Sequence, residues 1–368
     1  MILAYLAYLT FITWVLYSLK VTIFFIISRL YKPRKSNVKA RNVNLVVVTV
    51  ANSRVRGALE ETIENLKKFD LPVYVVIDEG AELTEWLRQR GVYLVVVPRN
   101  YRCGAIAKAR AINYFVENYV KESEWYVFFD DDSYPLDDSF LYEIPYYEKL
   151  GYVCANCVLY PRRGRNVYTY VLDFIRYLDD ITLFRACQGT LKKPIIGFHG
   201  EGLIVKGGVL KEIGFNFKSL TEDFRFAQEI VKKGYKSWHS NTRVSILSPS
   251  TLKDFIMQRA RWFKGIVMDL KYASILFYPL LPFTIALWSI SFFGSALFFV
   301  LSFFPFYKVL FFITFPSGFI YMLYGIFIVP KNVKLHEKII ALFVGVLESL
   351  APLFAFKIKG FYIIDKNV

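Results

Sequence analysis

The chain has 368 residues, a formal net charge of +15 and an apolar share of 55%. Soluble domains usually contain about 45–50% apolar residues. Here the excess lies at the two ends of the chain, which favours membrane segments over an entirely soluble protein. The basic residues flank these apolar runs instead of forming one stripe, which argues against nucleic-acid binding as the origin of the charge.

The first apolar run covers residues 2–19 and resumes after Lys20 from Val21 to Leu30. It is long enough for a membrane-spanning helix, which needs about 20 apolar residues. It has neither the basic start nor the small-residue cleavage site of a signal peptide. Five basic residues follow it: Lys32, Arg34, Lys35, Lys39 and Arg41. We therefore expect an uncleaved anchor over residues 1–31, followed by a domain on the cytosolic side.

From residue 43 the pattern changes to short apolar strands that alternate with helical segments. The predicted strands are Asn44–Val50, Val73–Asp78, Val92–Pro98 and Trp125–Asp130, and the predicted helices lie near 57–69, 82–90 and 105–119. This alternation predicts an α/β fold with a mostly parallel sheet covered by helices. Ligands of such sheets bind at the carboxyl ends of the strands. Asp78 and Asp130 end two predicted strands and are therefore candidate site residues.

A basic helix start, Ala107-Lys108-Ala109-Arg110, precedes the last of these strands. Lys108 could bind a diphosphate there. A solvated helix face is the more common explanation of such a pattern.

Three consecutive acids, Asp130, Asp131 and Asp132, follow the fourth predicted strand. Burying them without partners would be costly, and carboxylate oxygens are the ligands that Mg²⁺ and Mn²⁺ prefer. In an extended chain Asp130 and Asp132 would point to one side and Asp131 to the other. The pattern favours a divalent-metal site, with an acidic surface loop as the alternative.

The segment Thr221-Glu222-Asp223 begins another predicted helix, which Gly234 ends. Asp223 would lie in the first turn, where the helix dipole favours the ionised carboxylate, and it could act as a general base. Taken alone, acids that only complement the helix dipole are the more common explanation.

A Thr-x-x-Asp capping motif opens a predicted helix that carries Gln258, Arg261 and Trp262 on one face. Arg can bind phosphate oxygens, Trp can stack on a sugar ring, and Gln can hydrogen-bond hydroxyl groups. An interfacial helix, with Trp262 in the aromatic belt and Arg259 and Arg261 at lipid headgroups, accounts for the same pattern equally well.

Three further apolar runs lie near 277–303, 308–329 and 338–356. Each is long enough to cross a membrane, and prolines interrupt or bound them. Four spans in all would put the C-terminus outside, yet Lys357 and Lys359 follow the last run. One run could therefore be interfacial or re-entrant. We expect about three C-terminal transmembrane helices over residues 277–357.

Taken in this order, the D-x-D, T-E-D and Q-x-x-R-W segments make Asn44 to Gly265 resemble family 2 glycosyltransferases with a Q-x-x-R-W signature. That group includes cellulose, hyaluronan and mannan synthases and the egghead-like mannosyltransferases. The three motifs together are specific, although each alone is weak. The resemblance implies a GT-A fold, a Rossmann-like nucleotide-sugar domain, over residues 43–265, with an interfacial helix over 251–272.

The resemblance also implies donor-site roles for the matching positions. Asp78 would contact the nucleotide base, Lys108 the diphosphate, and Arg261 the leaving diphosphate. Asp130 and Asp132 would hold the donor and the metal, Mg²⁺ or Mn²⁺.

Further positions match the acceptor side of the family's site. Asp223 would deprotonate the acceptor hydroxyl. Trp262 would stack on the acceptor sugar with Gln258 beside it. His199 and Glu222 would also lie in the acceptor pocket.

We therefore expect a membrane-bound inverting glycosyltransferase that moves a sugar from a UDP- or GDP-sugar to a glycan or lipid-linked acceptor. Attack opposite the leaving diphosphate would give a β-linkage from an α-linked donor. A processive polysaccharide synthase is the alternative among enzymes, although the few spans favour a single transfer. The non-enzymatic alternative is a membrane scaffold that binds nucleotide sugars. No nucleic-acid partner is expected.

Overall fold

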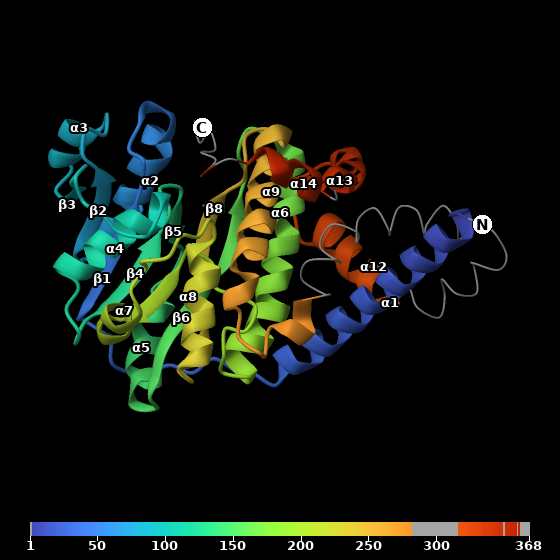
Figure 1. The fold of residues 1–368 in the computed structure, drawn as a ribbon, viewed down its shortest axis with the longest axis horizontal. Helices are drawn as coiled ribbons and strands as arrows, with labels where there is room; N and C mark the ends of the chain where they lie inside the picture. Colours follow the sequence, from blue (N-terminus) through green and yellow to red (C-terminus); the bar gives the residue numbers. More distant parts are fainter. Residues whose placement is uncertain (1, 282–315, 349, 359, 361–368) are drawn as a thin grey trace.

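The computed structural model describes residues 2–281, 316–348, 350–358 and 360, which form an α/β domain with helices at both ends (Figure 1). The strands are β1 (Val43–Val48), β2 (Val73–Asp78), β3 (Tyr93–Val97), β4 (Trp125–Phe129), β5 (Ser133–Pro135), β6 (Tyr152–Arg162), β7 (Leu203–Lys206) and β8 (Lys236–Leu247). The helices of the domain are α2 (Arg56–Lys67), α3 (Thr84–Arg88), α4 (Ala107–Tyr119), α5 (Ser139–Lys149), α6 (Val167–Asp179), α7 (Gly207–Ile213), α8 (Glu222–Lys232) and α9 (Leu252–Asp269). The flanking helices are α1 (Ile2–Arg29), α12 (Pro316–Leu323), α13 (Leu335–Glu348) and α14 (Ala351–Phe354).

The strands of the described residues form one eight-stranded sheet in the order β3-β2-β1-β4-β7-β6-β8-β5. Strands β1 to β4 pair in parallel, and β6 is parallel to β8. Strand β7 runs antiparallel to β4 and β6, and β5 runs antiparallel to β8. The predicted mostly parallel sheet is therefore found in the half from β3 to β4, whereas the other half is mixed because β7 opposes both of its neighbours.

The four predicted strands and the three predicted helices are found within a few residues of their expected bounds. The helix expected over 82–90 is shorter, since α3 spans only Thr84–Arg88. Turns flank this helix on both sides, and Leu87 is its buried residue.

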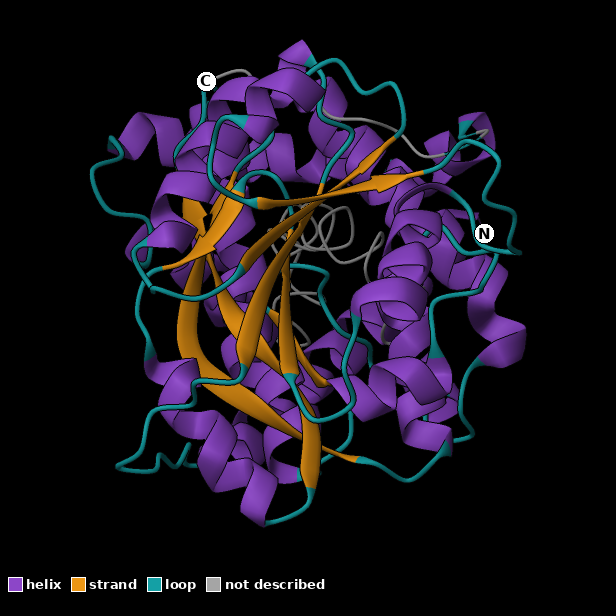
Figure 2. Cartoon of the chain, turned by 90° about the vertical axis from the view of Figure 1, so that its left-hand side faces the viewer, coloured by secondary structure: helices purple, strands orange, loops and turns teal. Residues whose placement is uncertain are grey.

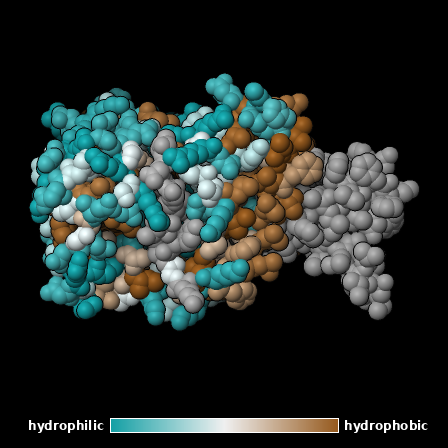
Figure 3. All heavy atoms as spheres, turned by 90° about the horizontal axis from the view of Figure 1, so that it is seen from above, coloured by the Kyte–Doolittle hydropathy of each residue, from teal (hydrophilic) through white to brown (hydrophobic). Residues whose placement is uncertain are grey.

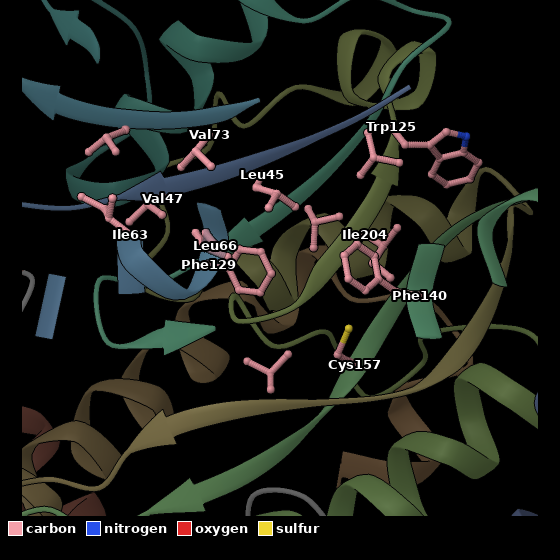
Figure 4. Packing of buried hydrophobic residues seen from close by; sticks show 14 of the residues in the cluster. Leu45, Val47, Ile63, Leu66, Val73, Trp125, Phe129, Phe140, Cys157 and Ile204 are labelled. Atoms are coloured by element: carbon pink, nitrogen blue, oxygen red, sulfur yellow. The ribbon is translucent and has the colours of Figure 1, made fainter. Parts of the chain in front are cut away.

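Helices cover both faces of the sheet, as the view in Figure 2 shows. On one face, Leu45 and Val47 of β1 pack with Ile63 and Leu66 of α2 and with residues of α5 such as Phe140 (Figure 4). On the other face, alternate residues of the same strands pack against α4, α7 and α8. Because successive side chains of a strand point to opposite faces, fully apolar strands are what a sheet covered on both sides requires.

A second layer of helices lies between the sheet domain and the flanking helices. Helix α6 continues directly into a π-helix, η2 (Asp180–Thr190). Leu172 of α6 shares a buried cluster with Phe255 of α9, Met322 of α12 and Ala341 of α13. The rare π-helical geometry often occurs at functional sites.

The segment after α1 runs along the domain. The backbone amides of Ser36 and Ala40 donate to carbonyl oxygens of Tyr142 and Leu141 in α5, both at 2.8 Å. The hydroxyl of Tyr31 also hydrogen-bonds the backbone carbonyl of His239 at 2.9 Å. Helix α1 is therefore tied closely to the sheet domain through the segment that follows it.

No single helix in the described part of the chain is long and apolar enough to cross a membrane. Leu335–Glu348 and Ala351–Lys357, bent by 48°, meet that criterion together by length and composition alone. The runs predicted over 277–303 and 308–329 lie largely or partly outside the described residues, because 282–315 are not described. On the face that Figure 3 shows, hydrophilic side chains predominate over the sheet domain, and hydrophobic side chains gather towards the flanking helices.

Candidate active site

A cavity of about 470 Å³ opens where β1, β2 and β4 end. This is the edge at which parallel sheets bind their ligands. All ten residues singled out from the sequence line it: Asp78, Lys108, Asp130, Asp132, His199, Glu222, Asp223, Gln258, Arg261 and Trp262. The three motifs, remote from one another in the chain, therefore meet around one cavity.

The three acids after β4 lie in a turn. The backbone amide of Ser133 donates to the carbonyl oxygen of Asp130 at 3.2 Å, and Asp131 accepts a hydrogen bond from the Thr49 hydroxyl at 2.6 Å. The expectation that Asp131 points away was wrong, since all three acids line the cavity. It assumed an extended chain, and the turn removes the two-residue alternation of a strand.

Lys108 lies in the first turn of α4, directly after Ala107. Ala107 has φ of +50°, a backbone conformation that is strained for a residue with a β-carbon and that clusters at functional sites. The Lys108 ammonium pairs with Asp130 and lies 3.9 Å from the Glu222 carboxylate. Burial alone would lower the pKa of Lys108, but Asp130 and Glu222 outweigh it and raise the pKa. Lys108 therefore remains a cation inside the cavity.

Asp223 lies in the first turn of α8. Thr221 occupies the predicted N-cap position, but its hydroxyl makes no capping hydrogen bond. Burial and then Glu222 raise the pKa of Asp223 to about 7, while the Phe224 amide and Lys108 offset part of this shift. A carboxyl group with a pKa near the operating pH is well suited to general base catalysis.

Three of these groups meet at Gly200. A β-carbon there would lie 2.9 Å from the Lys108 ammonium nitrogen, 3.9 Å from Asp223 Oδ2 and 4.0 Å from Asp130 Oδ1. Gly200 therefore leaves room at the point where a cation, the half-buried Asp223 carboxyl and the end of β4 converge.

Helix α9 is docked directly onto the loop before α8. The hydroxyl of Thr251 accepts a hydrogen bond from the Asp254 amide at 3.0 Å and caps the helix as predicted. Arg261 Nη1 donates to the carbonyl oxygen of Leu220 at 3.0 Å. This contact joins the Q-x-x-R-W helix to the T-E-D segment.

The close packing of α9 depends on Gly265. A β-carbon on Gly265 would lie 2.6 Å from the side chain of Thr221. We expect Gly265→Ala to lower stability by about 1–3 kcal/mol through overpacking and to reduce turnover, because α9 must move away from the T-E-D segment. Thermal unfolding and turnover of the purified protein measure the two effects.

Gly57→Ala is the matched control, because Gly57 also lies in a helix and no atom lies within 4 Å of the position that its β-carbon would occupy. It should stabilise the protein by about 0.5–1 kcal/mol relative to glycine. Equal behaviour of the two variants would contradict the proposed close contact.

Trp262 faces two guanidinium groups. Those of Arg176 and Arg259 lie 4.7 Å and 4.4 Å from its ring centroid. Arg259 is only 2% exposed, so the alternative that placed it at lipid headgroups is wrong. Its environment is a set of buried ion pairs within the protein.

The half-buried His199 and the buried Asp180 form a pair beside the T-E-D segment. His199 Nε2 lies 2.5 Å from Asp180 Oδ1, and the His199 ring centroid lies 4.1 Å from that of Phe184. Burial lowers the pKa of His199, but the Asp180 carboxylate outweighs this and raises it. The second oxygen of Asp180 accepts a hydrogen bond from the Leu159 amide at 2.7 Å, which fixes the pair in place.

Asp78 lies at the outer end of the cavity. Its carboxylate pairs with Arg110 at 2.6 Å and its side chain is 62% exposed. This position leaves Asp78 accessible to a ligand that enters from solvent.

Sequence reasoning missed the wall of the cavity that α6 contributes. Arg176 and Asp179 line the cavity, and Arg176 lies 3.7 Å from Glu201. The available signal was the spacing of Arg176 and Asp179, which puts two charges three residues apart on neighbouring turns of a largely apolar helix.

The residues present fit a divalent cation that shares its ligands with a phosphate. No group of three His, Cys, Asp or Glu side chains among the described residues is arranged to hold a metal by itself. Asp130 and Asp132 nevertheless line the same cavity as Lys108. Mg²⁺ sites commonly use one or two carboxylates and complete their shell with water and substrate phosphates.

Comparison with known proteins places the chain among glycosyltransferases. The sequence pattern of the family described as glycosyl transferase family group 2 matches residues 125–329, more than half of the chain. The β-1,4-mannosyltransferase egh of Drosophila melanogaster is 28% identical over 213 residues, which cover 53% of this chain and 44% of that protein. The β-1,4-mannosyltransferase bre-3 of Caenorhabditis elegans is 26% identical over 211 residues, which cover 55% and 46%. The chain thus spans less than half the length of these curated relatives.

A solved structure has a similar fold. The mannosyltransferase PcManGT from Pyrobaculum calidifontis, in complex with GDP-Man and Mn²⁺, superposes with a TM-score of 0.51 at 16% sequence identity. The match covers 85% of this chain and 97% of that chain. At this identity the likeness concerns the fold.

Proposed function

Because the chain belongs to glycosyl transferase family group 2, we propose that it transfers a sugar from a nucleotide donor to an acceptor hydroxyl in the cavity described above. The observation that carries the proposal is the convergence of Lys108, Asp130 and Asp223 on Gly200. A cation for the diphosphate and a carboxyl for the acceptor proton are the two groups that such a transfer needs at one point. The mannosyltransferases among the relatives make GDP-mannose the first donor to test.

The donor half of the site comprises Asp78, Lys108, Asp130 and Arg261. Asp78 binds the base at the exposed end of the cavity, and Lys108 binds the diphosphate. Arg261 is held at the loop before α8 by its bond to Leu220 and stabilises the departing diphosphate. Fixed cations that face developing negative charge contribute strongly to catalysis, since they need no reorganisation during the reaction.

Asp130 and Asp132 would hold a divalent cation, Mg²⁺ or Mn²⁺, together with the donor phosphates. When bound, the cation would supply further neutralisation of charge on the leaving diphosphate.

Asp223 takes the proton from the attacking hydroxyl. The acceptor sugar lies against Trp262 and Gln258, with Glu222 and the half-buried His199 beside it. Attack from the acceptor side, opposite the leaving diphosphate, inverts the anomeric centre in a single displacement. Holding both substrates in one cavity supplies a large part of the rate enhancement.

The proposal includes a membrane location, with residues 1–31 as anchor, residues 43–265 as catalytic domain on the cytosolic side and residues 277–357 as C-terminal membrane helices. Exposed apolar side chains on the flanking helices support it: Leu19, Ile23, Phe25 and Ile26 of α1, Phe343 of α13 and Leu353 of α14. Exposed basic residues after α1, among them Lys32 and Arg34, favour the cytosolic side for the domain.

The pKa of Asp223 predicts the pH dependence of the transfer. Only the deprotonated carboxylate accepts a proton, and the pKa of about 7 means that activity is lost as the pH falls through this value. We expect kcat/KM to fall about tenfold per pH unit below pH 7 and to level off above it. An inflection near pH 4, the ordinary value for Asp, would show that another group limits the reaction.

A panel of nucleotide sugars tests the proposed function. UDP- and GDP-sugars are incubated with the detergent-solubilised protein with and without Mn²⁺, and release of nucleoside diphosphate is measured together with the length of the labelled product. One donor should be turned over in a metal-dependent manner and yield a single added sugar. A ladder of longer products would instead indicate a processive synthase, and binding without turnover of any donor would indicate a scaffold.

A further inference from the structure

Arg259 is a buried cation in the middle of the Q-x-x-R-W helix. Its Nη2 atom lies 2.7 Å from Asp173 Oδ1 of α6, and its Nε atom lies 3.2 Å from Glu348 Oε1 of α13. Arg259 is 2% exposed and Asp173 is completely buried. One guanidinium group therefore connects three helices that lie far apart in the chain.

The same guanidinium group also contacts Gln258 and Trp262, the two residues that we propose bind the acceptor sugar. It donates from Nη1 to the side-chain oxygen of Gln258. Its central carbon lies 4.4 Å from the ring centroid of Trp262 and 4.3 Å from that of Phe255. Because guanidinium is planar and its donors are fixed in direction, these contacts constrain the amide and the indole together.

Stability alone is a poor explanation for such an arrangement. Buried ion pairs can often be replaced by well-packed apolar residues without loss of stability, because removing charges from water is costly. Both Arg259 and Glu348 also line the cavity. A buried charge network at the wall of a ligand site fits a role in fixing the site's geometry.

We propose that Arg259 is a positioning residue: held by Asp173 and Glu348, it sets the orientation of Gln258 and Trp262 in the acceptor half of the site. This inference rests on the proposed glycosyl transfer. It adds that the acceptor half is complete only when α13 is docked against α9. The C-terminal bent pair, which reaches membrane-spanning length, thus contributes to the site as well as to anchoring.

The donor half provides an internal reference. Lys108 pairs with Asp130 and Glu222, and neither Asp173 nor Glu348 is among these partners. Loss of the Arg259 contacts should therefore impair the acceptor side and leave donor binding intact.

The kinetic test compares Arg259→Lys and Glu348→Gln with the unsubstituted protein in detergent. Lysine keeps the positive charge but lacks the branched guanidinium group, which contacts Asp173, Glu348 and Gln258 at the same time. We expect kcat for transfer to fall between about tenfold and a hundredfold and the acceptor KM to rise. The donor KM and the release of nucleoside diphosphate without acceptor should change less than about twofold.

Arg225→Lys is the matched control. Arg225 pairs with Glu229 at 3.1 Å and its side chain is 13% exposed, but it does not line the cavity. Arg225→Lys should leave kcat and the acceptor KM unchanged. The proposal would be overturned if Arg259→Lys changed the donor KM as much as the acceptor KM. It would also be overturned if Arg259→Lys and Arg225→Lys had the same kcat and KM values.

A spectroscopic readout keeps this test independent of activity. The emission contributed by Trp262 is obtained as the difference between a protein and its Trp262→Phe counterpart. We expect this difference spectrum to change in Arg259→Lys and Glu348→Gln and to stay unchanged in Arg225→Lys. An unchanged Trp262 spectrum would overturn the positioning role. If the wild-type protein turned over no donor while the spectrum changed, the proposed function would fail and the positioning role would stand.

Discussion

Asp223→Asn is expected to lower kcat for sugar transfer by about 10²–10⁴-fold, the usual contribution of a general base. Asparagine has nearly the same shape but cannot accept the proton of the acceptor hydroxyl. Donor binding should persist, because Lys108 and its partner Asp130 are unchanged. The measurement is the initial rate of transfer at saturating donor and acceptor, together with the donor Kd. The pH dependence below pH 7 should also disappear in the residual activity.

Asp70→Asn is a suitable control for this substitution. Asp70 is exposed at the end of α2 and does not line the cavity. Its backbone has φ of +54°, which asparagine tolerates well. Full activity in Asp223→Asn would remove Asp223 from the mechanism.

Asp132→Asn is expected to have the second largest effect. Asp132 is buried at the cavity wall and is one of two carboxylates proposed for the cation. We expect kcat to fall by about 10²–10³-fold, as when one electrostatic group is removed from an active site. The Mn²⁺ concentration for half-maximal activity should rise at least about tenfold. A metal titration of turnover at fixed donor concentration measures both.

Asp138→Asn is the control for this substitution. It removes another acid close to β5, the strand that Asp132 directly precedes. Asp138 lies beyond β5, pairs with Lys39 at 3.3 Å and is well exposed. It should leave the metal titration unchanged. Turnover that persists at the wild-type level in EDTA, or an Asp132→Asn protein with an unaltered titration, would refute the proposed metal site.

The parallel half of the sheet was predictable because β1 to β4 are short apolar runs separated by helical segments. The mixed half was not, since β5 (Ser133–Pro135) and β7 (Leu203–Lys206) have three and four residues. Such strands are too short to show a periodicity. Their direction follows from tertiary pairing with β8, β4 and β6, which local sequence does not encode.

The motif residues of the cavity were predictable because each lies in a short contiguous segment with a local pattern, either directly after an apolar strand or within a predicted helix. Asp130 at the end of β4 and Asp223 at the start of α8 are examples. The partners of Arg259 were not predictable in this way. They lie 86 and 89 residues away in the chain, and only the packing of α6 and α13 against α9 brings them together.

The partial burial of Asp223 has a thermodynamic consequence for the whole molecule. Its pKa is about 7 in the folded protein and about 4 in an unfolded chain. Between these values the folded state holds a proton that the unfolded state has released, so the stability that this group contributes declines as the pH rises from 4 towards 7 and stays low above it. The ionised form that accepts the acceptor's proton is therefore also the form that the fold tolerates least. Reactivity at this position is maintained at the expense of resistance to unfolding, a conflict that is common where a protein performs chemistry.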